Sequence, residues 1–164
     1  MLSRLDAAIE GLRVNTTATG LVVRVEPAPG DETDPARLCW SNAGHPPPIV
    51  VPPGAGAAAL DDDDPDLLLG VLAEVDRKET VSWIEPGGSL LLYTDGLVER
   101  RGESIDAGVA ALTAAVDRFS DLPLPVMCDR VLADLLPEDH DDVALVAVRL
   151  RAPGESGAVP QWAE

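Results

Sequence analysis

The sequence predicts an α+β fold, in which a largely antiparallel sheet or pair of sheets is flanked by helices. Three observations support this fold class. The chain opens with apolar residues at helical spacing, continues with short apolar runs separated by glycine and proline, and closes with two more helical patterns and a last apolar strand. Its 164 residues, 46% of them hydrophobic, suffice for one domain with its own core.

The first third of the chain is expected to form a helix and three strands. Apolar residues at helical spacing predict the helix: Leu2, Leu5, Ile9 and Leu12. Residues 19–27 and 37–44 indicate two strands, which the intervening loop would pair as a hairpin. Residues 49–51 are a short apolar run between prolines, a pattern typical of an edge strand.

Residues 54–66 end in a run of aspartates. A solvated loop is the simplest interpretation of such a run. Calcium binding is the alternative, but the alternating ligands, central glycine and distal glutamate of an EF-hand are missing from this segment.

The second half is expected to form two strands at residues 80–84 and 89–94, joined by a turn, then two helices and a final strand. The helices are predicted by two apolar faces, separated by Pro123 and Pro125: Ile105, Val109, Leu112 and Val116, then Cys128, Val131, Leu132 and Leu135. Residues 141–150 are nearly continuous in apolar side chains, which predicts a strand buried on both faces. We therefore expect a domain over residues 1–150 and a flexible tail over residues 151–164.

The charge balance excludes some classes of partner. The chain carries 29 acidic and 12 basic residues, a formal net charge of -17. Nucleic acids and anionic membranes both require a basic surface, so neither is an expected partner. The chain has no signal-like or membrane-spanning apolar run, which favours a cytoplasmic protein. Cys39 and Cys128 lack the spacing of a zinc site or disulfide framework, so two inert thiols are the simplest interpretation.

Carboxylates stand at the ends of two strongly apolar strands. Asp95 follows Leu90–Thr94, and Asp141 and Asp142 precede the last strand. Hard divalent cations prefer oxygen ligands on rigid supports, and adjacent central strands would bring Asp95 and Asp141 together. Gly96 would then allow a sharp turn close to the ion. The alternative is structural, because Asp-Gly is also a common turn pair and Asp-Asp can simply flank a strand.

Four ordered segments resemble a known family: "SNAGHPPPIVV", "LLLGV", "VSWIEPGGSLLLYTDGLVERRG" and "DHDDVALVAVRL". Together they look like the SpoIIE-like branch of the PPM (type 2C) metal-dependent serine/threonine protein phosphatases. The resemblance extends over about residues 5–150. It implies a PPM-phosphatase-like β-sandwich of mainly antiparallel strands flanked by helices, with a two-metal centre of Mn²⁺ or Mg²⁺ at one end.

The resemblance also implies roles for individual residues. Asp95 matches a metal ligand in the family's Asp-Gly motif, Asp141 matches the ligand in its closing Asp-Asp motif, and Asp142 occupies the second position of that motif. The implied reaction is hydrolysis of phosphoserine or phosphothreonine on a regulatory protein by a metal-activated water. His45 has two interpretations: a general acid, or a conformational fixture whose ring nitrogens bond to backbone.

The match also implies that the fold is N-terminally incomplete. Further metal-binding aspartates belong to the family's N-terminal portion, in a Gly-Asp strand and an Asp-x-x-Gly-His-Gly-like turn, and neither occurs in this sequence. Three explanations remain open. The chain is a fragment or a gene model that starts too late, or it is a degenerate pseudophosphatase that acts as an interaction module, or another chain completes the site. The expected partner is a phosphorylated regulatory protein of the anti-sigma-antagonist type, with an upstream sensor region or a completing chain as further possibilities.

Overall fold

The computed structural model of the protein describes residues 1–12, 16–27, 30, 33–60, 66–72, 75–136, 142–152 and 154. Its helices are α1 (Leu2–Gly11), α2 (Ile105–Phe119) and α3 (Leu124–Leu135), with a 3-10 turn, η1 (Asp95–Leu97). Its strands are β1 (Gly20–Glu26), β2 (Ala36–Ala43), β3 (Ile49–Val51), β4 (Ala58–Ala59), β5 (Thr80–Ile84), β6 (Ser89–Tyr93) and β7 (Leu145–Arg149). Asp141, the aspartate run at residues 61–64 and most of the tail beyond residue 150 lie outside the described residues.

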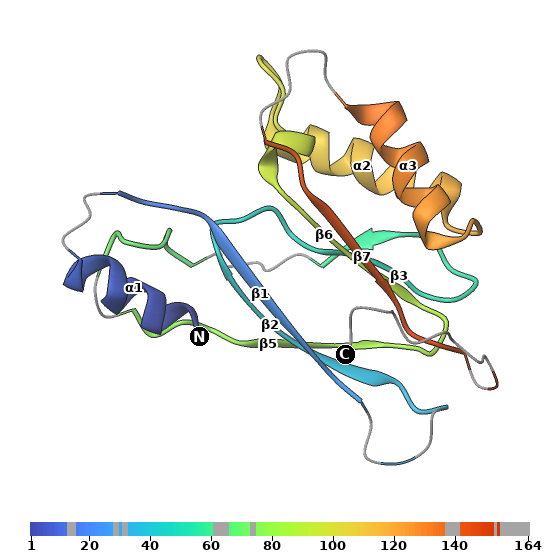
Figure 1. Ribbon diagram of the computed structural model, residues 1–164, viewed down its shortest axis with the longest axis horizontal. Helices are drawn as coiled ribbons and strands as arrows, with labels where there is room; N and C mark the ends of the chain where they lie inside the picture. Colours follow the sequence, from blue (N-terminus) through green and yellow to red (C-terminus); the bar gives the residue numbers. More distant parts are fainter. Residues whose placement is uncertain are drawn as a thin grey trace, which may run out of the picture.

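The strands form two antiparallel sheets (Figure 1). The first sheet has the order β1-β2-β5 and the second has the order β4-β3-β6-β7. β1 and β2 pair as the predicted hairpin, with Gly20 opposite Ala43 and Glu26 opposite Arg37. Helices α2 and α3 pack on the second sheet, whereas α1 lies beside the first sheet at the other end of the molecule. The predicted α+β class, with mainly antiparallel strands flanked by helices, is confirmed.

Alternate residues of the second sheet enter two different cores, because successive side chains of a strand point to opposite faces. Ile49 and Leu91 face α2 and α3 in the largest cluster of buried residues. Val50 and Leu90 face the first sheet, where they meet Leu38 of β2 in a smaller cluster. The second sheet is therefore the middle layer of the molecule.

The turn after β5 moves the chain from one sheet to the other. Both strands form where the sequence predicts them, and the Gly88 N–H donates to the Glu85 carbonyl at 2.9 Å to close the turn. Gly87 adopts a φ of 87°, which favours glycine. β5 pairs with β2 and β6 pairs with β3 and β7, so these consecutive strands do not pair with each other.

The prediction that residues 49–51 form an edge strand is wrong. β3 lies between β4 and β6, and all three of its residues are buried. Prolines flank this strand and do not interrupt it, so its own N–H groups remain available for pairing. The strand that covers it, β4, has only two residues, and its alanines gave little sequence signal.

The prediction that the last strand is buried on both faces is also wrong. β7 lies at the edge of the second sheet in the described part of the chain, and its residues alternate between half-buried and exposed. Leu145 and Ala147 pack against the helical layer. Val146 and Val148 point the other way and are 55% and 44% exposed, because no strand of the described first sheet covers them.

The helices form where the apolar spacing predicts them, with two adjustments. Pro123 is the N-cap of α3 and Pro125 lies in its first turn, where a missing N–H is tolerated. In α1 the expected apolar face is only partly buried, since Leu2 is buried whereas Leu5 and Leu12 are 44% and 75% exposed.

A buried ion pair fixes α1. Asp6 is fully buried, and its carboxylate accepts from Arg77 Nε at 3.0 Å and from Arg77 NH2 at 2.9 Å. The Gly70 N–H donates to the same carboxylate at 3.1 Å. Arg77 also donates to the carbonyls of Leu67 and Leu68. The "LLLGV" segment is thereby tied to the helix by polar contacts that the hydrophobic pattern does not show.

Candidate metal-binding strand mouth

The ends of β6 and β7 lie side by side and bring acidic residues to one edge of the second sheet. Tyr93 is opposite Leu145 in the antiparallel pair, and the Thr94 N–H donates to the Ala144 carbonyl at 3.0 Å. Asp95 follows directly on β6, and Asp142 precedes β7 by three residues. We call this edge, residues 93–97 and 142–145, the strand mouth. Asp141 lies outside the described residues, so its position is not assigned.

The Thr94 side chain joins the ends of β6 and β7 by two hydrogen bonds. Its hydroxyl donates to the Asp142 carbonyl at 3.0 Å and accepts from the Ala144 N–H at 2.8 Å. This role of Thr94 was not predicted from the sequence. A threonine immediately before the aspartate, at the end of a predicted buried strand, is the signal that could have found it.

Asp95 is half-buried and begins the turn η1. Its carbonyl accepts from the N–H groups of Val98 and Glu99 at 2.8 and 2.7 Å, and its Oδ1 accepts from the Gly96 N–H at 3.0 Å. The backbone that carries this carboxylate is therefore well fixed. Gly96 lies within the 3-10 turn and is not among the glycines with positive φ, so the expected glycine-specific sharp turn is not found.

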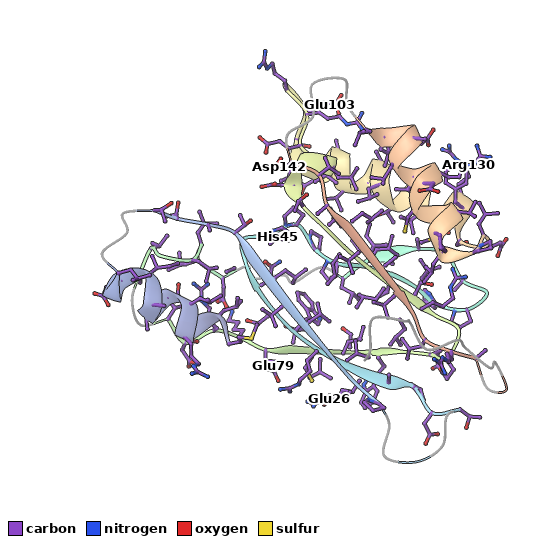
Figure 2. The ribbon with its side chains drawn as sticks, viewed as in Figure 1. Glu26, His45, Glu79, Glu103, Arg130 and Asp142 are labelled. Carbon is purple, nitrogen blue, oxygen red and sulfur yellow. The ribbon has the colours of Figure 1, made fainter. Side chains whose placement is uncertain are left out.

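His45 reaches the strand mouth from the first sheet (Figure 2). Its Nε2 lies 2.7 Å from the Tyr93 carbonyl oxygen, and its Nδ1 lies 2.9 Å from the Thr19 hydroxyl. Asn42 closes the preceding turn, since its amide accepts from the His45 N–H and donates to the His45 carbonyl, both at 2.7 Å. Gly44 completes this turn with a φ of 69°. Both ring nitrogens have partners and one of them is a backbone carbonyl, as the conformational interpretation expects; the general-acid role stays a prediction.

The residues at the strand mouth fit a hard cation in donor type. Asp95 and Asp142 offer carboxylate oxygens on rigid supports, which Mg²⁺ and Mn²⁺ prefer. Within the residues that the structure describes, no group of three or more His, Cys, Asp or Glu side chains converges as a metal site. Among the described residues, the strand mouth thus offers the carboxylates of Asp95 and Asp142, and their role as metal ligands stays a prediction.

Among the described residues, Cys128 and Tyr93 have raised pKa values, which disfavour their reactive deprotonated forms. Cys39 and Cys128 are both free thiols. Burial, and to a lesser extent the neighbouring Asp129, raises the pKa of the Cys128 thiol and so disfavours its reactive thiolate. Burial also raises the pKa of Tyr93, whose hydroxyl donates to the Pro47 carbonyl at 2.9 Å.

Among the described helices, none is long and apolar enough to cross a membrane.

The sequence matches one family model and several solved structures. Residues 1–151 match the model described as Stage II sporulation protein E (SpoIIE). The structure of the RsbU and RsbW domains of Rv1364c from Mycobacterium tuberculosis is 28% identical, with a TM-score of 0.71 over 92% of this chain. This chain spans 41% of that one, less than half its length. No curated protein sequence matches the chain.

Two more distant structures share the fold. The phosphatase domain of SpoIIE from Bacillus subtilis, presoaked with Mn, is 14% identical with a TM-score of 0.54, over 93% of this chain and 68% of that one. The catalytic domain of the serine/threonine protein phosphatase PstP, in complex with two manganese ions, is 16% identical with a TM-score of 0.53, over 89% of this chain and 65% of that one. The predicted PPM-phosphatase-like sandwich is thereby confirmed as the fold.

Proposed function

Because the chain belongs to the SpoIIE family, we propose that it acts as a metal-dependent protein serine/threonine phosphatase that hydrolyses phosphoserine or phosphothreonine on a regulatory protein. Residues 1–150 would form the C-terminal portion of the phosphatase domain. The strand mouth is the observation that carries this proposal, since the paired ends of β6 and β7 bring Asp95 and Asp142 to one edge of the sheet.

Each residue of the strand mouth has a part in the proposed site. Asp95 would be a metal ligand, with Asp141 and Asp142 supplying ligands from the adjoining strand end. Thr94 keeps the two strand ends in register through its bonds to Asp142 and Ala144. Bound Mn²⁺ or Mg²⁺ would neutralise charge on the phosphoryl oxygens and make water a better nucleophile.

The proposed partner is a phosphorylated regulatory protein in the cytoplasm. Support for this class of partner comes from the similar M. tuberculosis protein, in which RsbU and RsbW domains occur in one chain. The net charge of -17 disfavours direct binding of an anionic phosphoryl group by the protein surface. Cations at the strand mouth would supply the missing positive charge.

The test is metal-dependent turnover by the 164-residue chain. We expect a phosphoserine peptide and p-nitrophenyl phosphate to be hydrolysed with Mn²⁺ or Mg²⁺ and not after chelation by EDTA. Asp95→Asn should abolish turnover, whereas the matched control Glu103→Gln, at an exposed carboxylate outside the strand mouth, should leave it unchanged. A folded chain without metal-dependent turnover would contradict the proposal.

A second candidate is a non-catalytic module that binds the phosphoprotein. It is favoured by the absence, within the described residues, of three or more converging acidic, His or Cys side chains. This alternative predicts binding of the phosphoprotein without release of phosphate. A folded chain that neither turns over nor binds any phosphoprotein contradicts both candidates.

A further inference from the structure

The "HPPP" sequence creates a gap in the hydrogen bonding of the second sheet. β3 and β6 pair with Ile49 opposite Leu91, and the same register places Pro47 opposite Tyr93. Proline has no N–H, so Pro47 cannot donate to the Tyr93 carbonyl across the sheet. A buried carbonyl without a donor would cost stability. The donor comes instead from a side chain two residues earlier, His45, whose Nε2 lies 2.7 Å from this oxygen.

The contacts of the ring define its tautomer. The Tyr93 carbonyl can only accept a hydrogen bond, so Nε2 carries the proton. In the neutral form of this ring Nδ1 is an acceptor, to which the Thr19 hydroxyl can donate at 2.9 Å. The paired bonds of Asn42 to the His45 backbone hold the base of the side chain. The imidazole is thus held at three points.

The peptide unit between Tyr93 and Thr94 is hydrogen-bonded on both sides. His45 binds its oxygen, and the Ala144 carbonyl binds its N–H at 3.0 Å. Because a peptide unit is planar, these two bonds together fix its orientation. Asp95 is the next residue but one along the chain from Tyr93, so the direction of its Cα–Cβ bond depends on this peptide unit.

We propose that His45 is a positioning residue for Asp95: its Nε2–H replaces the donor that Pro47 lacks, orients the Tyr93–Thr94 peptide, and so holds the Asp95 carboxylate for a divalent cation. The part of this inference that concerns the cation rests on the proposed function. The part that concerns the peptide unit does not. Residues that orient a metal ligand typically contribute about 10- to 100-fold to metal affinity, and we expect an effect in that range.

Two substitutions of His45 separate a positioning role from general loss of structure. A glutamine amide nitrogen reaches about as far as Nε2 and can donate to the Tyr93 carbonyl, whereas an asparagine amide reaches only as far as Nδ1. We expect His45→Asn to speed hydrogen exchange of the Thr94 amide and to weaken Mn²⁺ binding about 10- to 100-fold. His45→Gln should restore most of the protection of the Thr94 amide and most of the Mn²⁺ affinity. Equal behaviour of the two variants, or unchanged exchange at Thr94 in His45→Asn, would overturn the proposal.

A matched pair at Thr19 tests the tautomer without changing the histidine. The chain has two histidines, so His140→Gln leaves His45 as the source of the long-range ¹⁵N–¹H imidazole signals. We expect the pattern of a neutral Nε2–H ring in the parent chain and in Thr19→Ser, and we expect Thr19→Val to keep it because the Tyr93 carbonyl still accepts from Nε2. An Nδ1–H ring in the parent chain contradicts the proposal. Failure to bind Mn²⁺ in every variant would count against the proposed function, while exchange at Thr94 and the ring tautomer would still decide the role of His45.

Discussion

Two carboxylates of this chain, Asp6 and Asp95, show how the surroundings of an acidic group separate a structural role from the metal-binding role that we propose. Asp6 is fully buried and its charge is matched by the bidentate guanidinium of Arg77. Asp95 is half-buried at the strand mouth, and in the described part of the chain no basic side chain forms an ion pair with it. A carboxylate already paired with arginine has little to offer a cation, whereas the Asp95 carboxylate lies without such a described partner on a backbone that hydrogen bonds fix.

The largest effect should come from breaking the ion pair of Asp6. Asp6→Ala leaves Arg77 buried without its counter-charge, and removal of one partner of a buried pair typically costs about 3–5 kcal/mol. Urea denaturation of the two variants measures the contrast: Asp6→Ala should lose most of its stability, whereas Asp95→Asn should change by about 1 kcal/mol or less. Comparable losses for both would show that Asp95 is also a structural carboxylate.

The strand mouth itself depends on close packing. Gly108 lets α2 approach the backbone after η1, and a Cβ at this position would collide with the Val98 carbonyl oxygen. Gly108→Ala should therefore destabilise the fold by about 1–3 kcal/mol and weaken Mn²⁺ binding. Gly11→Ala is the matched helical control, because nothing lies within 4 Å of its added Cβ. An equally stable Gly108→Ala variant would show that α2 does not position the strand mouth.

Loss of the two hydrogen bonds of the Thr94 hydroxyl should have a smaller effect on stability. Thr94→Val removes both hydrogen bonds of the hydroxyl and keeps the branched shape, at a cost of about 1–2 kcal/mol. Thr94→Ser should recover most of the stability and of the Mn²⁺ affinity. Thermal unfolding and Mn²⁺ titration of the two variants check this. If Thr94→Ser were no more stable and bound Mn²⁺ no more tightly than Thr94→Val, the two hydrogen bonds would not have the role described.

The smallest effect is expected at Glu26, a carboxylate that is paired but whose side chain is 37% exposed. The hydrogen bond from Arg37, with smaller contributions from the charges of Arg24 and Arg37, lowers the pKa of Glu26 below its ordinary 4.5. A lowered pKa in the folded state gives stability above the ordinary pKa, which is lost as the pH falls through the folded value. Glu26→Gln should thus remove a small part of the acid dependence below pH 4.5 without changing Mn²⁺ binding. If Glu26→Gln lost more stability than Asp6→Ala, the surface carboxylate would matter more than the buried one, contrary to this expectation.

The sequence predicts those features that are local. The apolar run before Asp95 is followed at once by a polar residue pair, so the end of β6 is visible in a few residues. Pairing of β6 with β7 brings the chain at Asp95 beside Asp142, whereas the predicted approach of Asp95 to Asp141 stays a prediction because Asp141 lies outside the described residues. The first hairpin and both later helices are likewise encoded by short patterns and their turns.

Features that depend on distant partners could not be predicted in this way. Asp6 lies on the buried face of α1 because Arg77 meets it from 71 residues away. β3 is an interior strand because two alanines pair with it, and alanine carries no strand signal. The exposure of Val146 and Val148 depends on how far the first sheet extends, which no local pattern specifies.

The most direct test of the account is to locate Mn²⁺ on the chain by paramagnetic broadening of its backbone amide signals. At substoichiometric Mn²⁺ we predict that the amides of Thr94, Gly96, Asp142 and Ala144 broaden first, and that Asp95→Asn abolishes this selectivity. Broadening centred elsewhere on the acidic surface, or an unchanged pattern in Asp95→Asn, would contradict the assignment of the strand mouth as the cation site.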